Sequence, residues 1–267
     1  MLKQRVITAL IIVPLVVLLV LCAPTWILAL VAGLMVLVGS WEWSVLSGEN
    51  TSILKISNTL ITAVLLYLLW LSRQEYLILW SVALAALIWW LFAFFWIFWW
   101  RREFYSRMKF FCGMLTLIPS WLALVALHAS QNGAVKLLFL LTLIWAADIG
   151  AYFVGKVFGK YKLAPKVSPG KTWEGVAGGT LALLIVSLLG VWMVLPANGY
   201  PLILICLLTG WLSIVGDLSE SLFKRQAGVK DSGRLFPGHG GVLDRVDSLT
   251  AALPAFWLGL AFQEWLR

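Results

Sequence analysis

The stretch that decides the fold is residues 76–100, which read YLILWSVALAALIWWLFAFFWIFWW. None of these residues is charged, and an apolar run of roughly 20 residues is long enough to cross the hydrocarbon core of a bilayer as one helix. The portion from Trp89 to Trp100 makes the run long enough for the helix to tilt or kink. This stretch therefore predicts a transmembrane helix.

The rest of the chain has the same character. Of its 267 residues, 62% are hydrophobic and 12% are charged, and the mean hydropathy is +0.95, which excludes an ordinary soluble globule. Apolar segments of spanning or near-spanning length lie at residues 6–22, 25–46, 53–71, 76–100, 110–128, 134–154, 174–195, 201–219 and 248–266. We therefore predict an all-α integral membrane protein, a polytopic bundle of about nine transmembrane helices that forms a single membrane domain over residues 1–267.

Lysine and arginine are distributed unevenly over the predicted loops. If the N-terminus is inside, 17 of the 20 lie on the inner side and three, Arg73, Lys136 and Arg267, lie outside. Positive residues accumulate in cytoplasmic loops, so this pattern predicts a cytoplasmic N-terminus and, with nine spans, an outer C-terminus. The net charge of +8 then faces anionic headgroups, which makes nucleic acid a poor explanation for a pI near 9.6.

The N-terminal segment could be a secretory signal or a first transmembrane helix. Met1-Leu-Lys-Gln-Arg5 and the apolar run after it also fit a secretory signal, but the run is long and no convincing small-x-small cleavage site follows. We therefore expect an uncleaved first helix.

Cys22, Cys112 and Cys206 lie singly in apolar stretches, as small core residues do, and indicate neither a disulfide framework nor a cysteine metal site.

The inner loop that follows residue 154 is rich in lysine and leads into a helix. Its candidate phosphate-binding residues are Lys166, Ser168 and Lys171, with Asp148 near the end of the preceding helix. Glycine lets a backbone approach a phosphate, lysine neutralises it, and a helix N-terminus offers unpaired N–H groups. The loop is not a Walker P-loop, because Pro165 replaces the first glycine and no strand is expected in a helical architecture. A phosphate loop of another kind and a plain positive-inside loop both remain open.

A second inner loop gathers acids, cations and glycines between residues 216 and 247. On helices, Asp217 shares a face with Glu220 and Ser221, and Asp244 shares a face with Asp247, so two carboxylate faces could converge. Charges near a bilayer are costly, and Mg²⁺ is usually held by one or two carboxylates while substrate phosphates complete its shell. We therefore predict a metal site. The alternative is ion pairing of these acids with Lys224, Arg225 and Arg245.

His239 lies in Pro237-Gly-His-Gly-Gly241, where three glycines remove side-chain bulk around one imidazole. We interpret His239, Gly240 and Gly241 as candidate contacts to a nucleotide or phosphate. The alternatives are a loop histidine that bonds its own turn, and a hinge or linker.

The segment from Ser221 to Asp247 resembles the signature of the phosphatidate cytidylyltransferase (CDP-diacylglycerol synthase) family. Its pattern here is Ser-x2-Lys-Arg-x4-Lys-Asp-x-Gly-x2-hydrophobic-Pro-x-His-Gly-Gly-x2-Asp-Arg-x-Asp. The resemblance continues at Leu163 to Trp173, at Trp145-x2-Asp148, at Lys3-x-Arg5 and at Trp41-Glu-Trp43, and so covers essentially the whole chain. The signature positions match without departure, whereas the upstream helices match only in general character.

The resemblance implies condensation of CTP with phosphatidic acid to CDP-diacylglycerol and pyrophosphate, in a Mg²⁺-dependent reaction at the cytoplasmic face. It also implies residence in the inner (plasma) membrane of a bacterium among membrane lipids, and it leaves open a homodimer and a second cation, which could be monovalent. Residues 1–133 would be N-terminal helices, and residues 134–267 would carry the catalytic site.

Roles then follow for the candidate residues. We assign Asp217, Asp244 and Asp247 to the metal. The cations expected to neutralise the triphosphate and lipid phosphate are Lys166, Lys171, Lys224, Arg225, Lys230 and Arg245. Asp148 would be a second polar anchor, and Ser168 and Ser221 would bind phosphate oxygens. No residue is marked as a reader of the cytosine base.

Lipid access would occur at the inner ends of the sixth to ninth helices, so that acyl chains stay in the bilayer.

Three alternative functions remain open. A CTP-dependent lipid kinase would release CDP instead of pyrophosphate, and a CDP-alcohol phosphotransferase would carry an Asp-Gly-x2-Ala-Arg pattern that this chain lacks. A transporter would place charges along a midplane path, whereas here they gather at one face.

Overall fold

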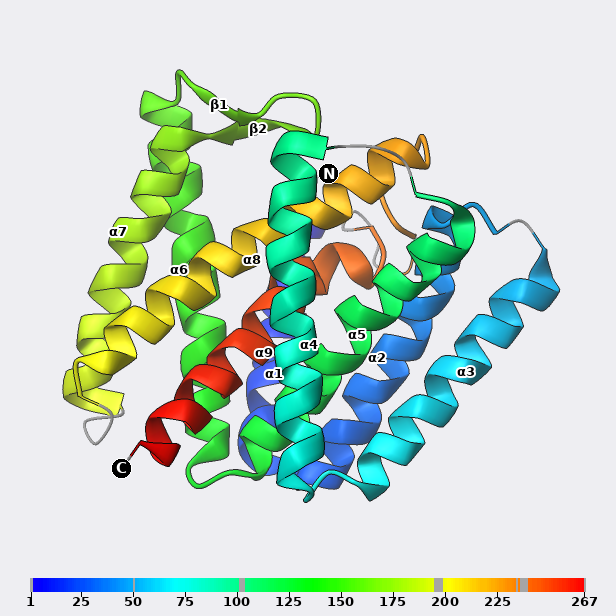
Figure 1. The fold of residues 1–267 in the computed structure, drawn as a ribbon. Coiled ribbons are helices and arrows are strands. Elements are labelled where there is room, and N and C mark those ends of the chain that lie inside the picture. The colour runs from blue at the N-terminus through cyan, green and yellow to red at the C-terminus, as the bar shows by residue number, and fades with distance from the viewer. Residues whose placement is uncertain are drawn as a thin grey trace.

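The computed structural model describes residues 2–49, 51–100, 104–194, 199–233, 235 and 240–266. They form a bundle of long helices with one small hairpin beyond the helix ends (Figure 1). In chain order the elements are α1 (Leu2–Cys22), α2 (Thr25–Leu46), α3 (Ser52–Leu71), α4 (Tyr76–Phe95), α5 (Ser106–Ala129), α6 (Gly133–Phe158), β1 (Lys162–Ala164), β2 (Ser168–Thr172), α7 (Trp173–Leu189), α8 (Pro201–Gln226) and α9 (Leu243–Trp265). The predicted all-α fold is confirmed.

Seven helices among the described residues, α2 to α8, are long and apolar enough to cross a membrane. The apolar part of α1 is shorter and runs over Leu10–Cys22. The protein is therefore a multi-pass membrane protein. The two termini lie at opposite ends of the bundle (Figure 1), as an odd number of helices requires.

Several helices extend beyond their apolar segments. The eighth was predicted to end at residue 219, but α8 continues to Gln226, and α9 begins at Leu243 instead of residue 248. Lys224 and Arg225 lie in the last turn of α8, where cations favour a helix C-terminus. As a result, both ends of the charged signature, residues 221–226 and 243–247, are helical, and their side chains have defined directions.

The predicted tilt or kink of the fourth segment corresponds to a change of helix type. The α-helix ends at Phe95 and continues as a π-helical turn, η1, over Trp96–Trp100. The widened turn places Trp96 in the core, where its ring packs 5.0 Å from that of Phe223 on α8. Trp43 of α2 also packs against Phe223, with ring centroids 4.9 Å apart.

The lysine-rich loop contains strands, and here the expectation of no strand was wrong. β1 and β2 pair antiparallel, with Lys162 opposite Thr172 and Ala164 opposite Ser168. The hairpin projects past the ends of α6 and α7 (Figure 1). Outside the bundle, water can satisfy the unpaired edges of two strands, so the rule against open edges inside a bilayer does not apply.

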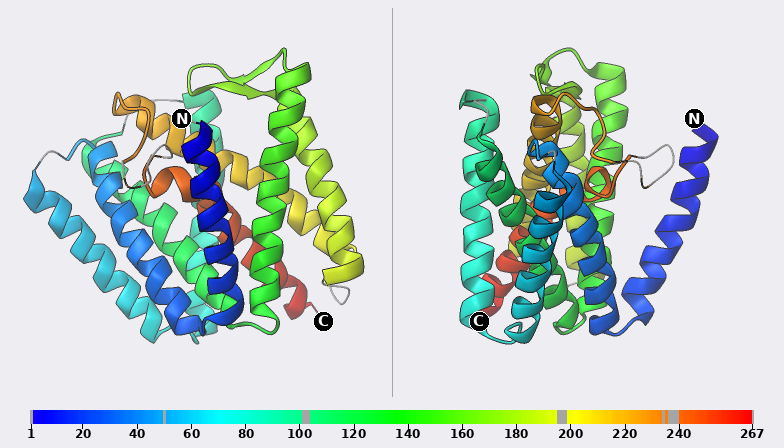
Figure 2. Two further views of the ribbon diagram at one scale, coloured as in Figure 1. Left: turned by 180° about the vertical axis from the view of Figure 1, so that it is seen from behind. Right: turned by 90° about the vertical axis from the view of Figure 1, so that its right-hand side faces the viewer.

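α8 and α9 cross in close contact near the centre of the molecule. Gly216 of α8 lies against the backbone of Asp247, and a side chain at this glycine would have no room. This close approach brings the polar turn of α8 next to the first turns of α9. α1, by contrast, diverges from the bundle towards its N-terminus, as the right-hand view of Figure 2 shows.

Candidate active site

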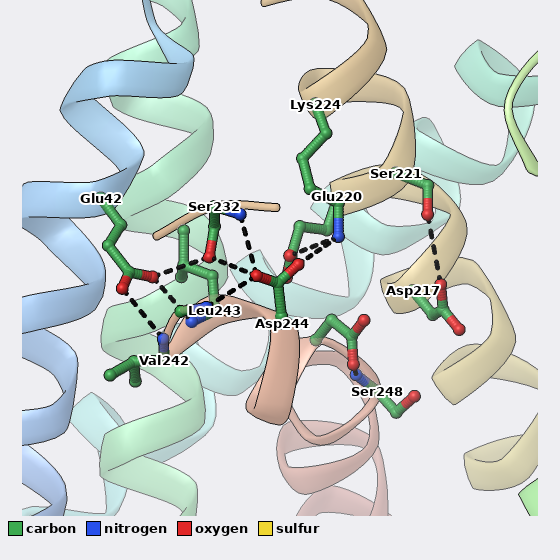
Figure 3. Close-up of polar contacts among 12 residues, drawn as sticks. Glu42, Asp217, Glu220, Ser221, Lys224, Ser232, Val242, Leu243, Asp244 and Ser248 are labelled. Carbon is green, nitrogen blue, oxygen red and sulfur yellow. Dashed lines mark hydrogen bonds and ion pairs between the residues drawn. The ribbon is translucent and has the colours of Figure 1, made fainter. Parts of the chain in front are cut away.

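Acids from α2, α8 and α9, a lysine from α8 and a serine from the loop after α8 meet at the N-terminal end of α9 (Figure 3). Glu42 of α2 lies at the centre of these contacts, and it is buried, with 6% of its surface exposed. Its carboxylate accepts hydrogen bonds from the backbone N–H groups of Val242 and Leu243, at 3.0 Å each, and from Ser232 Oγ at 2.8 Å. A carboxylate at this position satisfies unpaired N–H groups of the first helical turn, and the positive end of the helix dipole stabilises its negative charge.

Three glycines make this approach possible. A side chain at Gly233 or Gly241 would collide with the Glu42 carboxylate, and one at Gly240 would collide with Asp244. Gly240 also has a φ of +84°, which other residues resist. Gly240 and Gly241 were predicted to contact a nucleotide or phosphate; in the structure they give protein carboxylates access to the backbone.

Asp244 is held by four donors. One oxygen accepts from Lys224 Nζ at 2.6 Å, and the other accepts from the N–H groups of Ser232 and Gly241, at 2.8 and 2.9 Å. Ser232 Oγ, 3.0 Å from this second oxygen, shares its single proton between Asp244 and Glu42. Burial alone would raise the pKa of Asp244, but the hydrogen bonds from Lys224 and the two backbone N–H groups outweigh it and lower the pKa below its ordinary value. Asp244 is therefore a fixed anion.

Lys224 connects this anion to a second buried acid on its own helix. Its ammonium bonds Glu220 Oε1 at 3.0 Å, one turn earlier on α8, as well as Asp244. Lys224 and Glu220 are both buried. An ammonium with two carboxylate partners keeps this buried cluster neutralised, because a buried charge without a partner would cost several kcal/mol, about 3–5 when one partner is removed.

A second cluster surrounds Lys171, at the end of β2. Its ammonium lies 2.7 Å from Asp217 Oδ2, and Ser221 Oγ donates to Asp217 Oδ1 at 3.3 Å. Asp148 of α6 and Asp247 of α9 lie close enough to Asp217 to repel it and close enough to Lys171 to be attracted by it. The hairpin thus delivers one cation to Asp217, within electrostatic range of Asp148 and Asp247.

This second cluster has the chemistry of a hard-cation site. Carboxylate oxygens are the ligands that Mg²⁺ prefers, and Lys171 already occupies the region as a positive charge. Among the described residues, no three acids, histidines or cysteines come close enough to hold an ion by themselves. A metal held here would thus need additional ligands, and phosphate oxygens of a substrate can supply them.

The remaining predicted residues lie around these clusters. Arg225 donates from Nε to the backbone oxygen of Val167 at 3.4 Å, which ties α8 to the hairpin. Ser168 is half-buried in β2. Exposed cations at the same end of the molecule are Lys166, Lys230 and Arg245. His239 lies outside the described residues, so its predicted role stays a prediction.

Sequence reasoning assigned no role to Glu42, Glu220 or Ser232. Trp41-Glu-Trp43 was noticed only as part of the family resemblance, although an acid inside an apolar helix is itself a signal. Glu220 was seen to share a helix face with Asp217 and Ser221, but its pairing with Lys224 was not distinguished from other ion pairs. Ser232 carried no signal, because its partners lie on α2 and α9.

A family model matches almost the whole chain. The cytidylyltransferase family matches residues 3–263, which include α1, both charged clusters and most of α9. The chain belongs to the cytidylyltransferase family. The resemblance read from the signature is therefore confirmed, and the family match extends to the upstream helices.

Two bacterial relatives resemble this chain along most of its length, and a third resembles about half of it. A phosphatidate cytidylyltransferase of Pseudomonas aeruginosa is 42% identical over 266 residues, which cover 96% of each chain. One of Haemophilus influenzae is 36% identical over 281 residues, covering 96% of this chain and 97% of the relative. One of Brucella suis is 48% identical over 133 residues, or 49% of each chain.

Proposed function

We propose that this membrane protein is a CTP:phosphatidate cytidylyltransferase, which condenses CTP with phosphatidic acid to CDP-diacylglycerol and pyrophosphate in phospholipid biosynthesis. The observation that carries the proposal is the 42% identity to a phosphatidate cytidylyltransferase over 96% of both chains. The two charged clusters provide chemistry that suits this reaction.

The reaction joins two anions. An oxygen of the lipid phosphate attacks the α-phosphorus of CTP, a new P–O bond forms, and the bond to the bridging oxygen breaks so that pyrophosphate leaves. The lipid phosphate is already ionised, since a second phosphate pKa lies near about 6, so no strong general base is required. Together the substrates carry about six negative charges, so neutralising charge is the main task of the protein.

The cations divide into two kinds. Lys224 is buried between Glu220 and Asp244, so it orients Asp244 and the start of α9. Lys171 is only partly buried, with 28% of its side chain exposed, and can exchange Asp217 for a phosphate oxygen. Exposed Lys166, Arg225 and Lys230 border the same end of the molecule and would neutralise the triphosphate.

Mg²⁺ is the cofactor we propose for the second cluster. Of the three predicted ligands, Asp217 and Asp247 belong to the second cluster, whereas Asp244 belongs to the first, where Lys224, Ser232 and Gly241 already donate to it. When bound, the ion supplies charge neutralisation to the triphosphate and the departing pyrophosphate. A second cation and a homodimer stay predictions, tested by metal analysis and by molecular mass in solution.

The same proposal includes the location of the protein. The relatives are bacterial, and the chain has several helices that can cross a membrane, which favours the bacterial inner membrane. The lysine-rich hairpin and the exposed cations of the site lie at one end of the molecule, and positive residues accumulate on the cytoplasmic side. We therefore place the active site at the cytoplasmic face.

The decisive test follows the label of α-³²P CTP with purified protein, phosphatidic acid and Mg²⁺. We expect label in the lipid, loss of transfer with EDTA, and loss in Asp217→Asn, which removes a charge from the proposed metal site. Glu75→Gln is the matched control, because Glu75 is an exposed acid before α4, at the other end of the molecule.

Two results would reject the proposal. Label from γ-³²P CTP in the lipid, with α-label left in soluble CDP, would make the protein a CTP-dependent lipid kinase. Transfer of neither label, in protein that still unfolds cooperatively, would exclude both enzymes and direct attention to transport.

A further inference from the structure

A cavity of about 380 Å³ lies between α1 and the helices α2, α5, α6 and α9. Its size falls within the range of ligand pockets, about 300–1,000 Å³. The lining is apolar except for Ser120, Thr250 and Arg245. Ser120 and Thr250 donate their hydroxyls to carbonyls of their own helices, at 2.7 and 2.6 Å, so Arg245 is the charged side chain of the lining that can meet a ligand.

The first turns of α9 separate this cavity from the charged clusters. Residues that line the cavity follow a helical spacing on one face of α9: Val242, Arg245, Val246, Leu249 and Leu253. Asp244 and Asp247 lie on the other side of the same turns, with Lys224 and near Asp217. A molecule in the cavity would thus have one end about one helix diameter, roughly 10 Å, from the candidate active site.

Arg245 lies at the end of the cavity nearest the charged clusters. It is exposed, and within the described part of the chain its guanidinium forms no ion pair. A guanidinium is always charged and matches the geometry of a phosphate group. The cavity therefore has an apolar lining and a cationic end, and together these are complementary to an anionic phospholipid.

We infer that this cavity binds an acyl chain of the phosphatidic acid substrate, with Arg245 contacting the lipid phosphate. The inference rests on the proposed function and adds the place of the lipid. It also places lipid access on the side of the bundle covered by α1, whereas the sequence predicted access at the inner ends of the sixth to ninth helices. From Arg245 to Leu253 the lined face of α9 extends about 12 Å, less than half of a hydrocarbon core of about 30 Å. The cavity therefore holds the part of the chain next to the glycerol, and the remainder lies in the bilayer.

α1 provides a matched pair of substitutions. Leu19 lines the cavity, whereas its neighbour Leu18 is 56% exposed on the surface of the same helix. We expect Leu19→Trp to fill the cavity and to raise KM for dioleoyl phosphatidic acid by about tenfold, since losing contact with two methylenes is enough for that factor. KM for CTP, and activity on the short-chain dihexanoyl lipid, should stay at the wild-type level. Leu18→Trp should behave as wild type with all substrates.

Binding is measured independently with dioleoyl phosphatidic acid that carries a diazirine near the ester, followed by mass spectrometry of the photolabelled peptides. Labels are expected on the cavity faces of α1 and α9, reduced in Leu19→Trp and in Arg245→Gln. The inference is wrong if labels fall only on outer surfaces, if Leu19→Trp keeps the wild-type KM for the long-chain lipid, or if that variant loses the short-chain lipid equally. A dimer that dissociates in Leu19→Trp while lipid labelling persists elsewhere would instead assign the cavity to a second copy of the chain. Photolabelling of the cavity without cytidylyl transfer would reject the proposed function while retaining the lipid site.

Discussion

Glu42→Gln tests the carboxylate that connects α2 to the start of α9. The substitution preserves size but replaces one acceptor oxygen with an N–H₂ donor, which would face donors at Val242, Leu243 or Ser232. Hydrogen bonds to a charged group are worth about 1.5–3 kcal/mol, and a buried donor left unsatisfied costs about 1–3 kcal/mol. Since Glu42 is 6% exposed, water cannot replace the lost bond, and we expect a loss of about 3 kcal/mol in the free energy of unfolding.

This loss can be followed as an apparent Tm of the detergent-solubilised protein, measured at one scan rate. For a chain of this size, about 2–4 °C per kcal/mol predicts a decrease of roughly 6–12 °C. Because the start of α9 also carries Asp244, kcat should fall more than KM for CTP increases. Glu264→Gln is the control: Glu264 pairs with Lys136 at 3.2 Å but is 54% exposed, so its loss should cost under about 1 kcal/mol. An unchanged Tm in Glu42→Gln, or an equal decrease in the control, would refute this account of the helix start.

Three further substitutions test neighbouring contacts. Lys224→Met should destabilise the protein by about 3–5 kcal/mol and abolish transfer, because it leaves two acids without their shared cation; an active variant of wild-type Tm would contradict the cluster. Gly241→Ala should lower both Tm and kcat, since its methyl group would collide with Glu42, whereas Gly170→Ala, at a glycine with open space around it, should leave Tm unchanged. Thr172→Ala should cost about 1 kcal/mol, measured by the same thermal assay, because the Thr172 hydroxyl accepts from Gly175 N–H at 3.1 Å and caps α7; no change would show that the cap is dispensable.

The helices could be predicted well because the signal is local. A run such as residues 76–100 must satisfy its backbone hydrogen bonds internally in a bilayer, so its apolar character alone indicates a helix. Helix ends were less predictable. The charged turns of α8 and α9 lie where hydropathy changes sign, and their helical state depends on neighbours such as Glu42 and Lys224.

The candidate site was predicted in composition but not in its pairings. Residue spacing placed Asp217 with Ser221 on one helix face, and the structure joins them by a hydrogen bond. The same reasoning grouped Asp217 with Asp244 as equal metal ligands. In the structure these two acids have different cations, Lys171 and Lys224, because β2 approaches one of them and α8 the other.

The sequence by itself determined the class of the protein, its approximate number of helices and its family. These properties depend on the apolar composition of each segment and on a signature that lies within 27 consecutive residues, 221–247. The tertiary structure alone decided the role of Glu42, whose partners lie 190 to 201 residues away, the purpose of Gly240 and Gly241, and the cavity beneath α1. Contacts over such separations arise from the packing of whole helices, and no local pattern of residues encodes which faces will meet.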